Sequence, residues 1–342
     1  MQNKTLTALK GVKVGHSTHL DKLTGCTLVV FDGWYPTAYK SYGGSPGTFN
    51  TEILNNGMSF YRSNGIFVAG GSLTGLMSAS DIMQAMIENK IGSTDGKIIN
   101  PSLRGAIVFD LGVYLGQNYD PKFGREAFEN LSSDPVASGN VGAGTGTAVG
   151  KFQYVENGTK NAGMKAGVGS ARIDLGNGAF VSAMSVVNAL GNVVKEDGTI
   201  LAGNRDENKK FKVFEDTTEF VTNSKMNTTI TIVGTNVDLK TRENYERLAH
   251  MATHGQVRAI NPVHTSVDGD TVFVFSTEEI KSPLNSFGKY FETPDWPLFT
   301  VDVVGNTAAK AVQESIYDAC YKAETIQFEG AYKGIVPSTK DI

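Results

Sequence analysis

Cysteine is scarce in this chain, and its scarcity excludes one large class of small secreted folds. The 342 residues include only Cys26 and Cys320, too few for a disulfide framework, and both lie among apolar neighbours as buried core residues do. The N-terminus lacks the continuous apolar run of a signal peptide, and no later run is long enough for a transmembrane helix. We therefore expect a cytoplasmic protein that has no membrane partner.

The chain also carries little net charge. Lysine and arginine total 31 and aspartate and glutamate total 35, which gives a net charge of −4. Binding to nucleic acid or to an anionic membrane surface needs a basic surface, so we expect neither partner. His250 and His254 are four residues apart on an expected helix, but Met251 stands where the zinc motif His-Glu-x-x-His has glutamate. We expect no metal and no organic cofactor.

The chain does contain a mixture of strand and helix patterns. Apolar or β-branched runs predict strands at 26–31, 65–69, 105–111, 180–187, 229–233 and 271–276. Apolar residues at helical spacing predict helices over 76–87, 239–253 and 307–323. Asp238 and Thr307 are the candidate N-caps of the last two. Because strands and helices do not alternate strictly, the pattern favours layered sheets flanked by helices over a doubly wound parallel sheet.

One dipeptide carries chemical information of its own. Asn227-Thr228 lies where a polar stretch gives way to the β-branched run 228–233. Self-cleaving hydrolases store their nucleophile in this way, because cleavage before the threonine frees an α-amine beside its hydroxyl. Such an amine has a pKa near about 7.7–8.0 and can act as the base for that hydroxyl. An ordinary loop-to-strand junction, or an Asn-x-Thr glycosylation triplet, has the same sequence pattern.

Other residues have the types that amide hydrolysis needs. The glycine-rich run 139–151 ends in Lys151 and fits neither the dinucleotide fingerprint nor the phosphate loop. Asn188 follows an apolar run, where an amide can stabilise an oxyanion. Asp268 and Asp270 precede the last strand as two carboxylates that can divide acid and base roles. The plainer alternatives are a surface lysine, a turn asparagine and a solvated Asp-Gly turn.

A glycine pair marks a further candidate position. Gly70, Gly71 and Ser72 lie between a predicted strand and a predicted helix. Their amides can line a substrate pocket or bind a carboxylate at the helix N-terminus. A tight turn between the two elements would use the same residues, so the pattern leaves both interpretations open.

Taken in order along the chain, these motifs resemble those of the N-terminal-nucleophile amidases, a family that includes the 6-aminohexanoate-oligomer hydrolase (nylon hydrolase) and the D- and β-aminopeptidases. The resemblance runs from about Gly11 to the helix at Ala323. Any one motif is weak, whereas six in the same order are strong. The motifs are Gly43-Gly44-Ser45-Pro46-Gly47, Ala69-Gly70-Gly71-Ser72, the loop 142–151, Val187-Asn188, Asn227-Thr228-Thr229-Ile230 and His264-Thr265-Ser266-Val267-Asp268-Gly269-Asp270-Thr271.

The resemblance implies an α+β fold: a single four-layer αββα domain over residues 1–342, cut by self-cleavage into a larger chain, 1–227, and a smaller chain, 228–342. It implies that Thr228 is the nucleophile and that Lys151, Asn188, Asp268 and Asp270 complete the active site. Phe109 stands where the nylon hydrolase has a tyrosine that lines its substrate cleft, so a hydroxyl is missing here. By analogy with the family, the protein forms a homo-oligomer, a tetramer or larger.

The leading hypothesis is a self-processing threonine hydrolase that cleaves small linear amides or peptides through an acyl-enzyme on Thr228. The nylon hydrolase is the nearer branch of the family, because it shares the Asn-Thr junction and the Asp-Gly-Asp turn. The alternatives are an aminopeptidase that acts on D- or β-aminoacyl compounds, an acyltransferase like the ornithine acetyltransferases, and a binding protein that has the fold without the activity. The natural substrate does not follow from the sequence.

Overall fold

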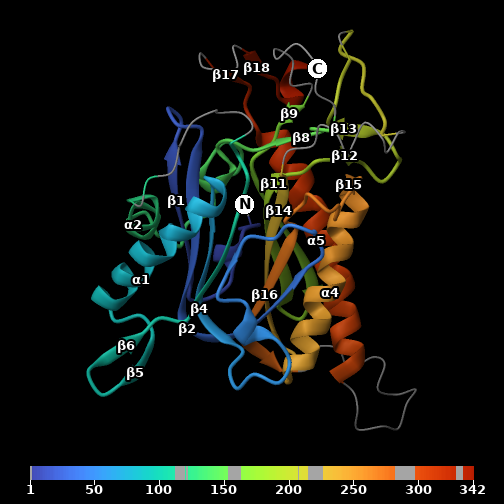
Figure 1. Ribbon diagram of the computed structural model, residues 1–342. Coiled ribbons are helices and arrows are strands. Elements are labelled where there is room, and N and C mark those ends of the chain that lie inside the picture. The colour runs from blue at the N-terminus through green and yellow to red at the C-terminus, as the bar shows by residue number, and fades with distance from the viewer. Residues whose placement is uncertain are drawn as a thin grey trace.

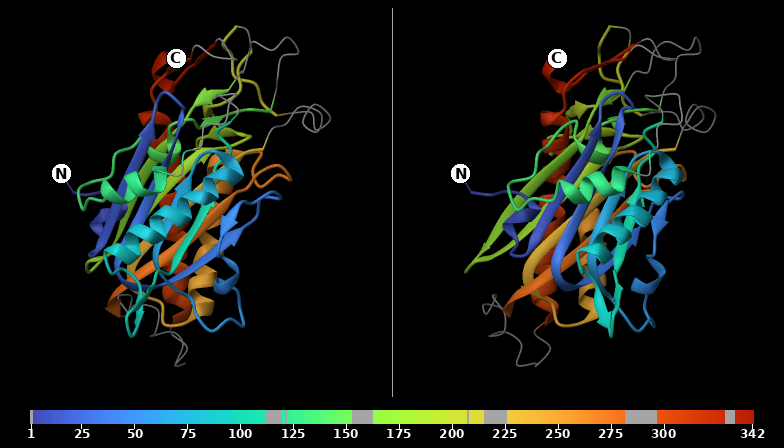
Figure 2. Two further views of the ribbon diagram at one scale, coloured as in Figure 1. Left: turned by 60° about the vertical axis from the view of Figure 1, so that its left-hand side comes forward. Right: turned by 90° about the vertical axis from the view of Figure 1, so that its left-hand side faces the viewer.

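The computed structural model describes residues 2–111, 120, 122–152, 163–206, 208–214, 226–281, 297–328 and 334–342. Figure 1 shows two β-sheets lying face to face, with a helical layer on the outer side of each. The views in Figure 2 show the same four layers from other sides. This arrangement confirms the α+β, four-layer αββα fold expected from the sequence.

The two sheets share one long strand, β2 (Thr24–Ser41). Its first half pairs with β1 (Val12–His19) and β4 (Arg62–Ala69), and the first sheet continues through β7 (Leu103–Ile107) to β3 (Thr48–Phe49). After an irregularity between Val30 and Tyr35, the second half of β2 pairs with β16 (Thr271–Lys281). The second sheet then runs through β14 (Thr228–Asp238) and β11 (Ala179–Asn188) to β10 (Val168–Gly176).

Apolar side chains fill the spaces between the four layers. Phe31 and Ile66 of the first sheet meet Ile232 and Phe273 of the second in the central core. Helices α1 (Ser78–Glu88) and α2 (Lys122–Glu129) cover the outer face of the first sheet. Helices α4 (Arg242–Ala259) and α5 (Pro297–Lys322) cover the outer face of the second. Among the described residues, no helix is long and apolar enough to cross a membrane.

Strand β14 is buried on both faces, although its sequence alternates threonine with apolar residues. Its apolar face, which includes Ile230 and Ile232, lies in the core between the sheets. On the helical side the Thr231 hydroxyl forms a hydrogen bond with that of Ser185, and the Ser185 hydroxyl forms another with that of Ser315 on α5. Hydroxyl groups are therefore tolerated on this buried face because they satisfy one another.

The predicted strands and helices are present in the structure, but several begin or end at other residues than predicted. The strand expected over 105–111 stops at Ile107. Thr241 rather than Asp238 is the N-cap of α4, because the Thr241 side chain accepts a hydrogen bond from the amide of Asn244. Helix α5 begins at Pro297, ten residues before the expected cap at Thr307, which lies in its interior. The 3₁₀ turn η3 (Ser72–Met77) precedes α1.

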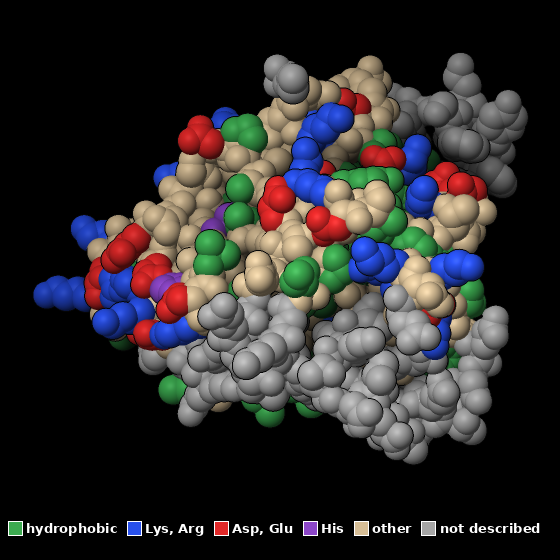
Figure 3. Space-filling view, turned by 90° about the horizontal axis from the view of Figure 1, so that it is seen from above, with side chains coloured by type: hydrophobic (Ala, Val, Ile, Leu, Met, Phe, Trp, Pro, Cys, Tyr) green, Lys and Arg blue, Asp and Glu red, His purple; other side chains and the backbone are tan. Residues whose placement is uncertain are grey.

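The remaining elements are short and lie mainly at the edges of the layers. They are β5 (Ser93–Asp95), β6 (Ile98–Asn100), β8 (Ala148–Val149), β9 (Met164–Lys165), β12 (Asn192–Val194), β13 (Ile200–Ala202), β15 (Ile260–Asn261), β17 (Ile326–Phe328), β18 (Gly334–Val336), η1 (Leu6–Ala8), η2 (Glu52–Leu54), η4 (Gly142–Gly144) and η5 (Thr339–Asp341). Seen from above, the described side chains of the end that carries β17 and β18 mix both charges with apolar groups, without a broad surface of one sign. Figure 3 thus agrees with the small net charge.

Candidate active site

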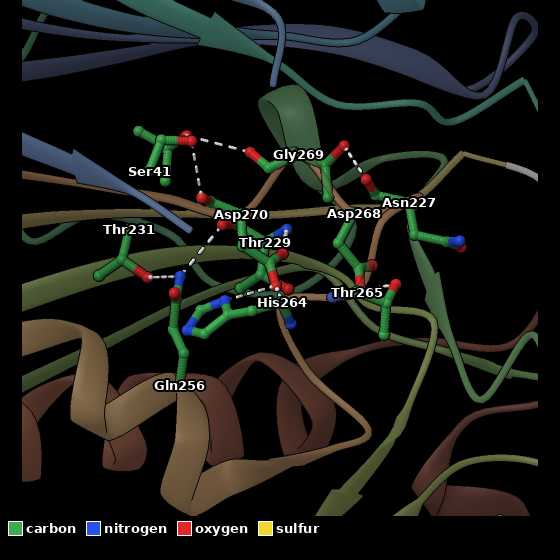
Figure 4. Close-up of polar contacts among 12 residues, drawn as sticks. Ser41, Asn227, Thr229, Thr231, Gln256, His264, Thr265, Asp268, Gly269 and Asp270 are labelled. Carbon is green, nitrogen blue, oxygen red and sulfur yellow. Dashed lines mark hydrogen bonds and ion pairs between the residues drawn. The ribbon is translucent and has the colours of Figure 1, made fainter. Parts of the chain in front are cut away.

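The Asn227–Thr228 junction is buried at the start of β14. Asn227 is 1% exposed and Thr228 is 2% exposed, so the junction is neither a surface loop nor an accessible glycosylation triplet in this fold. The Asn227 carbonyl oxygen accepts a hydrogen bond from the Gly269 amide at 2.8 Å and another from Thr228 Oγ1 at 2.5 Å. The Thr228 hydroxyl therefore lies against the peptide bond that precedes it, and Gly269 polarises the carbonyl of that bond. Gly269 and Asn227 lie side by side in Figure 4.

Parallel pairing brings the Asp-Gly-Asp segment to this junction. Strands β14 and β16 run parallel, with Ile230 opposite Thr271, so their starting ends lie side by side. The pairing extends backwards along both chains, because the Asn227 amide donates to the Val267 carbonyl oxygen at 2.9 Å. Residues about 40 positions apart in the sequence thus come together at one end of the second sheet.

Asn188 and Lys151 lie on the other side of Thr228. Asn188 ends β11 directly opposite Thr228 in the antiparallel register. Lys151 Nζ donates to Asn188 Oδ1 at 2.7 Å and to its backbone oxygen at 2.9 Å. The glycine-rich run therefore delivers its terminal lysine to the strand that flanks the candidate nucleophile.

The Asn188 side chain, expected from the sequence to stabilise an oxyanion, forms hydrogen bonds within the protein. Its Nδ2 donates to the carbonyl oxygen of Phe109 at 2.7 Å, and its Oδ1 accepts from the Ala148 amide at 3.2 Å as well as from Lys151. One amide proton is thus used inside the protein, which leaves the other for an oxyanion. The geometry favours a role for Asn188 in holding Lys151.

Burial lowers the pKa of Lys151 to about 7, and the nearby carboxylates Asp268, Asp110 and Asp270 act in the opposite direction. Lys151 is 7% exposed, so it is not the solvated surface lysine of the plainer alternative. An ammonium with a pKa near neutrality can stabilise a developing alkoxide and can also give up its proton.

The two aspartates are buried, which excludes a solvated turn. Asp268 is 1% exposed and Asp270 is 2% exposed. Asp270 Oδ1 accepts a hydrogen bond from the amide of Thr229, the residue after the candidate nucleophile, at 2.6 Å. Asp268 Oδ1 has no hydrogen-bond partner among the described residues. Asp270 therefore binds the backbone beside the junction with one oxygen, whereas Asp268 keeps one oxygen unbound among the described residues.

Burial, helped by the charge of Asp270, raises the pKa of Asp268 to about 7, against the opposing effects of the hydrogen bonds from Thr265 and the charge of Lys151. Asp268 and Lys151 thus titrate in the same range beside Thr228. Near neutral pH, such a pair can exchange a proton with a reacting group at little cost.

The segment Gly70-Gly71-Ser72 does not offer free amides to a substrate. The Gly71 amide donates to Asp110 Oδ1 at 2.8 Å, and the amides of Gly70 and Ser72 donate to backbone oxygens at 2.8 and 3.1 Å. The carboxylate that this helix start binds is therefore the protein's own Asp110. All three amides are engaged within the protein, as in the turn that the sequence also allowed, and a substrate contact by this segment stays a prediction.

Phe109 lies at the border of the site and is half-buried. Its carbonyl oxygen binds Asn188, as described above, and the next residue is Asp110, which is 1% exposed and accepts a hydrogen bond from Thr24 Oγ1 at 2.6 Å. Sequence reasoning missed Asp110. A usable signal was its position three residues after β7, where a polar residue interrupts an apolar run.

The two helical histidines contact each other on α4 and reach the site through Tyr42, whose amide donates to the Asp270 backbone oxygen. Their ring centroids are 5.2 Å apart on α4, and His250 Nδ1 forms a hydrogen bond with the hydroxyl of Tyr42 at 2.5 Å. Within the described part of the chain, no cluster of three or more His, Cys, Asp or Glu residues is arranged to hold a metal ion. His264 was missed as a site residue: its Nδ1 binds Asp270 Oδ2 at 3.0 Å.

Comparison with known proteins agrees with the fold. A profile of peptidase family S58 matches residues 4–333. An uncharacterized aminopeptidase of Mycobacterium leprae is 30% identical over 97% of this chain and 94% of its own length. The 6-aminohexanoate-oligomer endohydrolase of an Agromyces species is 27% identical over 80% of this chain and 75% of its own.

A solved structure has the same fold. It is the L-aminopeptidase D-Ala-esterase/amidase of Ochrobactrum anthropi, described as a variant of the Ntn hydrolase fold. It superposes with a TM-score of 0.70 over 98% of this chain and 91% of that one, at 18% sequence identity. This likeness shows the fold.

Proposed function

The chain belongs to peptidase family S58 and is an amide hydrolase, and from this premise we propose that Thr228 is its nucleophile, uncovered by self-cleavage of the Asn227–Thr228 bond. The observation that carries the proposal is the contact of Thr228 Oγ1 with the Asn227 carbonyl, whose oxygen is already bound by the Gly269 amide. In this proposal one αββα domain is cut into chains 1–227 and 228–342.

Self-cleavage begins when Thr228 Oγ attacks the carbonyl carbon of Asn227. The hydroxyl proton passes to a base, for which we propose ionised Asp268, and the oxyanion stays in the hydrogen bond from Gly269. The C–N bond then breaks, the departing nitrogen takes up a proton, and an ester joins Asn227 to Thr228 Oγ. Water hydrolyses the ester, which restores the hydroxyl and leaves a free α-amine on Thr228.

The mature enzyme repeats this chemistry on an external amide. The α-amine of Thr228 takes the proton of its own hydroxyl, because its ordinary pKa is about 7.7–8.0. Thr228 Oγ then forms an acyl-enzyme, the amine product leaves, and water releases the acid. Lys151, held by Asn188, stabilises the negative charge, and Asp270 fixes the backbone of the nucleophile through Thr229.

For the substrate we propose small linear amides, and 6-aminohexanoate oligomers are the first to test because one relative is named for their hydrolysis. An aminopeptidase acting on D- or β-aminoacyl compounds is the second candidate, since the relative that covers 97% of this chain is named an aminopeptidase. A side-by-side assay of both substrate classes separates them. Transfer of the acyl group to an added amine would instead indicate an acyltransferase.

The decisive experiment is intact-mass analysis of the purified protein. We expect two chains of roughly 24 and 12 kDa from the 36.6 kDa total, the second beginning at Thr228. Thr228→Ala should stay whole and inactive with an unchanged fold, and Thr228→Ser should regain part of both activities because it keeps a hydroxyl. A single wild-type species after long incubation, or an active Thr228→Ala variant, would refute the proposal.

A further inference from the structure

Two consecutive residues hold the two buried aspartates from the same side. His264 donates its backbone amide and its ring Nδ1 to Asp270 Oδ2, at 3.1 and 3.0 Å. Thr265 donates its backbone amide and its hydroxyl to Asp268 Oδ2, at 2.9 and 2.5 Å. Figure 4 shows His264 and Thr265 below the Asp268–Asp270 segment. Each residue therefore binds the Oδ2 atom of one carboxylate with two donors. We call these two Oδ2 atoms the outer oxygens and the two Oδ1 atoms the inner oxygens.

The backbone of His264 is bent to make this contact. Its φ is +56°, in the left-handed region that non-glycine residues seldom occupy, although histidine and asparagine are among those found there. This conformation lets the amide and the ring nitrogen of one residue meet the same oxygen. Strained backbone of this kind persists where the surrounding structure requires it, and it is concentrated at functional sites.

The binding of both outer oxygens decides what the inner oxygens can do. With Oδ2 fixed, Asp270 presents Oδ1 to the amide of Thr229. Asp268 likewise keeps Oδ1 free of partners among the described residues. A carboxylate held by two donors cannot turn its second oxygen away, so its direction is set before the reaction begins.

We propose that the His264-Thr265 dipeptide is a positioning clamp for the reaction, which fixes Asp270 and Asp268 so that their inner oxygens face the nucleophile at residue 228. This inference rests on the proposed role of Thr228. Neither residue touches the reacting atoms, and both act through the aspartate that they hold.

The clamp also holds the carboxylate of Asp268 close to that of Asp270. Two titratable groups act on Asp268: the charge of Asp270 repels its charge, and the charge of Lys151 attracts it. Asp110, which follows β7, acts on Lys151. The Thr265 hydrogen bonds lower the pKa of Asp268 against the effect of burial. Loss of the Thr265 hydroxyl should therefore raise that pKa and move the acid limb of the rate profile to higher pH.

Thr265→Val is the first test, because it removes the hydroxyl and keeps the shape of the side chain. We expect self-cleavage to slow by about 10–100-fold, as for a lost hydrogen bond to a charged group, and the acid limb to shift upwards. Thr265→Ser should recover most of the lost rate. The exposed Thr199 makes the same paired contact with Asp197, at 2.9 and 2.6 Å, so Thr199→Val is the matched control and should cleave like the wild type.

His264 allows a second test that separates the donor from the backbone. His264→Gly accepts the left-handed conformation but removes the ring donor, whereas His264→Asn also tolerates that conformation and places an amide where Nδ1 lies. We expect the glycine variant to slow self-cleavage by at least about tenfold and the asparagine variant to recover most of that loss. Melting temperatures of all variants show whether folding accounts for a difference.

The outcomes separate this inference from the proposed function. If the wild-type chain is not cut before Thr228, the proposed function fails. If the wild type is cut, and both Thr265→Val and His264→Gly are cut at its rate with its pH profile, the clamp is refuted while the nucleophile stands.

Discussion

Two lysines of this protein are alike in burial and in pKa, but they differ in the groups that their ammonium nitrogens contact. Lys151 and Lys165 are both buried, with exposed fractions of 7% and 0%. Burial lowers the pKa of each to about 7. Lys151 Nζ meets the side chain and backbone of Asn188 opposite Thr228, whereas Lys165 Nζ donates only to the backbone oxygens of Gly144 and Ala166 among its described hydrogen bonds.

The difference shows why a buried, shifted lysine does not by itself indicate an active site. Lys165 lies in β9 opposite Ala148, and its ammonium fastens the turn η4, so it holds the loop that ends in Lys151. Lys151 has the same low pKa but also has Asp268 and Asp270 within electrostatic reach. A perturbed pKa becomes a functional indication only together with a reacting group and complementary charges.

The largest expected effect separates the two lysines directly. Lys151→Met removes the cation that stabilises negative charge at Thr228 Oγ, so we expect self-cleavage and amide hydrolysis to fall by about 10²–10³-fold. Lys165→Met removes an equally buried ammonium from the loop and should cost less than about tenfold in rate. Quenched time courses analysed by intact mass, with melting temperatures for folding, measure both. Equal losses in the two variants would remove the distinction drawn here.

Asp268 and Asp270 give the next test, because their charges act on Lys151, whereas Lys165 shares only Asp110 with it. Asp270→Asn puts an NH2 group against a donor, either the Thr229 amide or His264, and Asp268→Asn removes a buried negative charge, so each should slow cleavage by about 10–100-fold. The double variant should lose less than the product of the two effects, since groups that act as one unit fail together. Asp197→Asn, in an exposed turn, is the control. Multiplicative losses would show that the two carboxylates act independently.

The contrast between the lysines also shows how far the sequence could predict the site. Local patterns pointed to Lys151 at the end of a glycine-rich run and to Thr228 at the start of a β-branched strand, but their roles were implied only by the resemblance of six motifs in the same order. Their proximity depends on strand register, which places Asn188 opposite Thr228, and register is set by packing between distant segments. Sequence patterns could therefore name these residues but not the hydrogen bonds between them.

Other features depended on tertiary contacts that leave no local pattern. Asp110 is buried because Thr24 and Gly71 bind its carboxylate, and neither partner is near it in the sequence. The start of α5 was expected at Thr307, since a threonine before an apolar stripe resembles a cap. The helix instead begins ten residues earlier, and the Thr307 hydroxyl was an incidental match to the cap pattern.

The smallest expected effect concerns the property that the two lysines share. Each lysine has a pKa of about 7 in the folded protein and about 10.4 when unfolded. Between these values the unfolded chain binds more protons, so the free energy of unfolding rises with pH, and each lysine adds at most about 1.4 kcal/mol per pH unit. Below pH 7 each lysine is protonated in both states, so its contribution to the slope vanishes. Asp268 has the opposite sign below neutrality, because its folded pKa is raised.

Urea unfolding between pH 7 and pH 8.5 isolates this term. The window ends there because burial raises the pKa of Cys26 and Cys320 to about 12, and unfolded thiols begin to titrate near about 8.5. In a Thr228→Ala background, which keeps the chain whole, Lys151→Met and Lys165→Met should each reduce the slope of unfolding free energy against pH by a similar amount. A slope that changes only with Lys151→Met would mean that Lys165 is charged in the folded protein, and that the two lysines differ in protonation as well as in their surroundings.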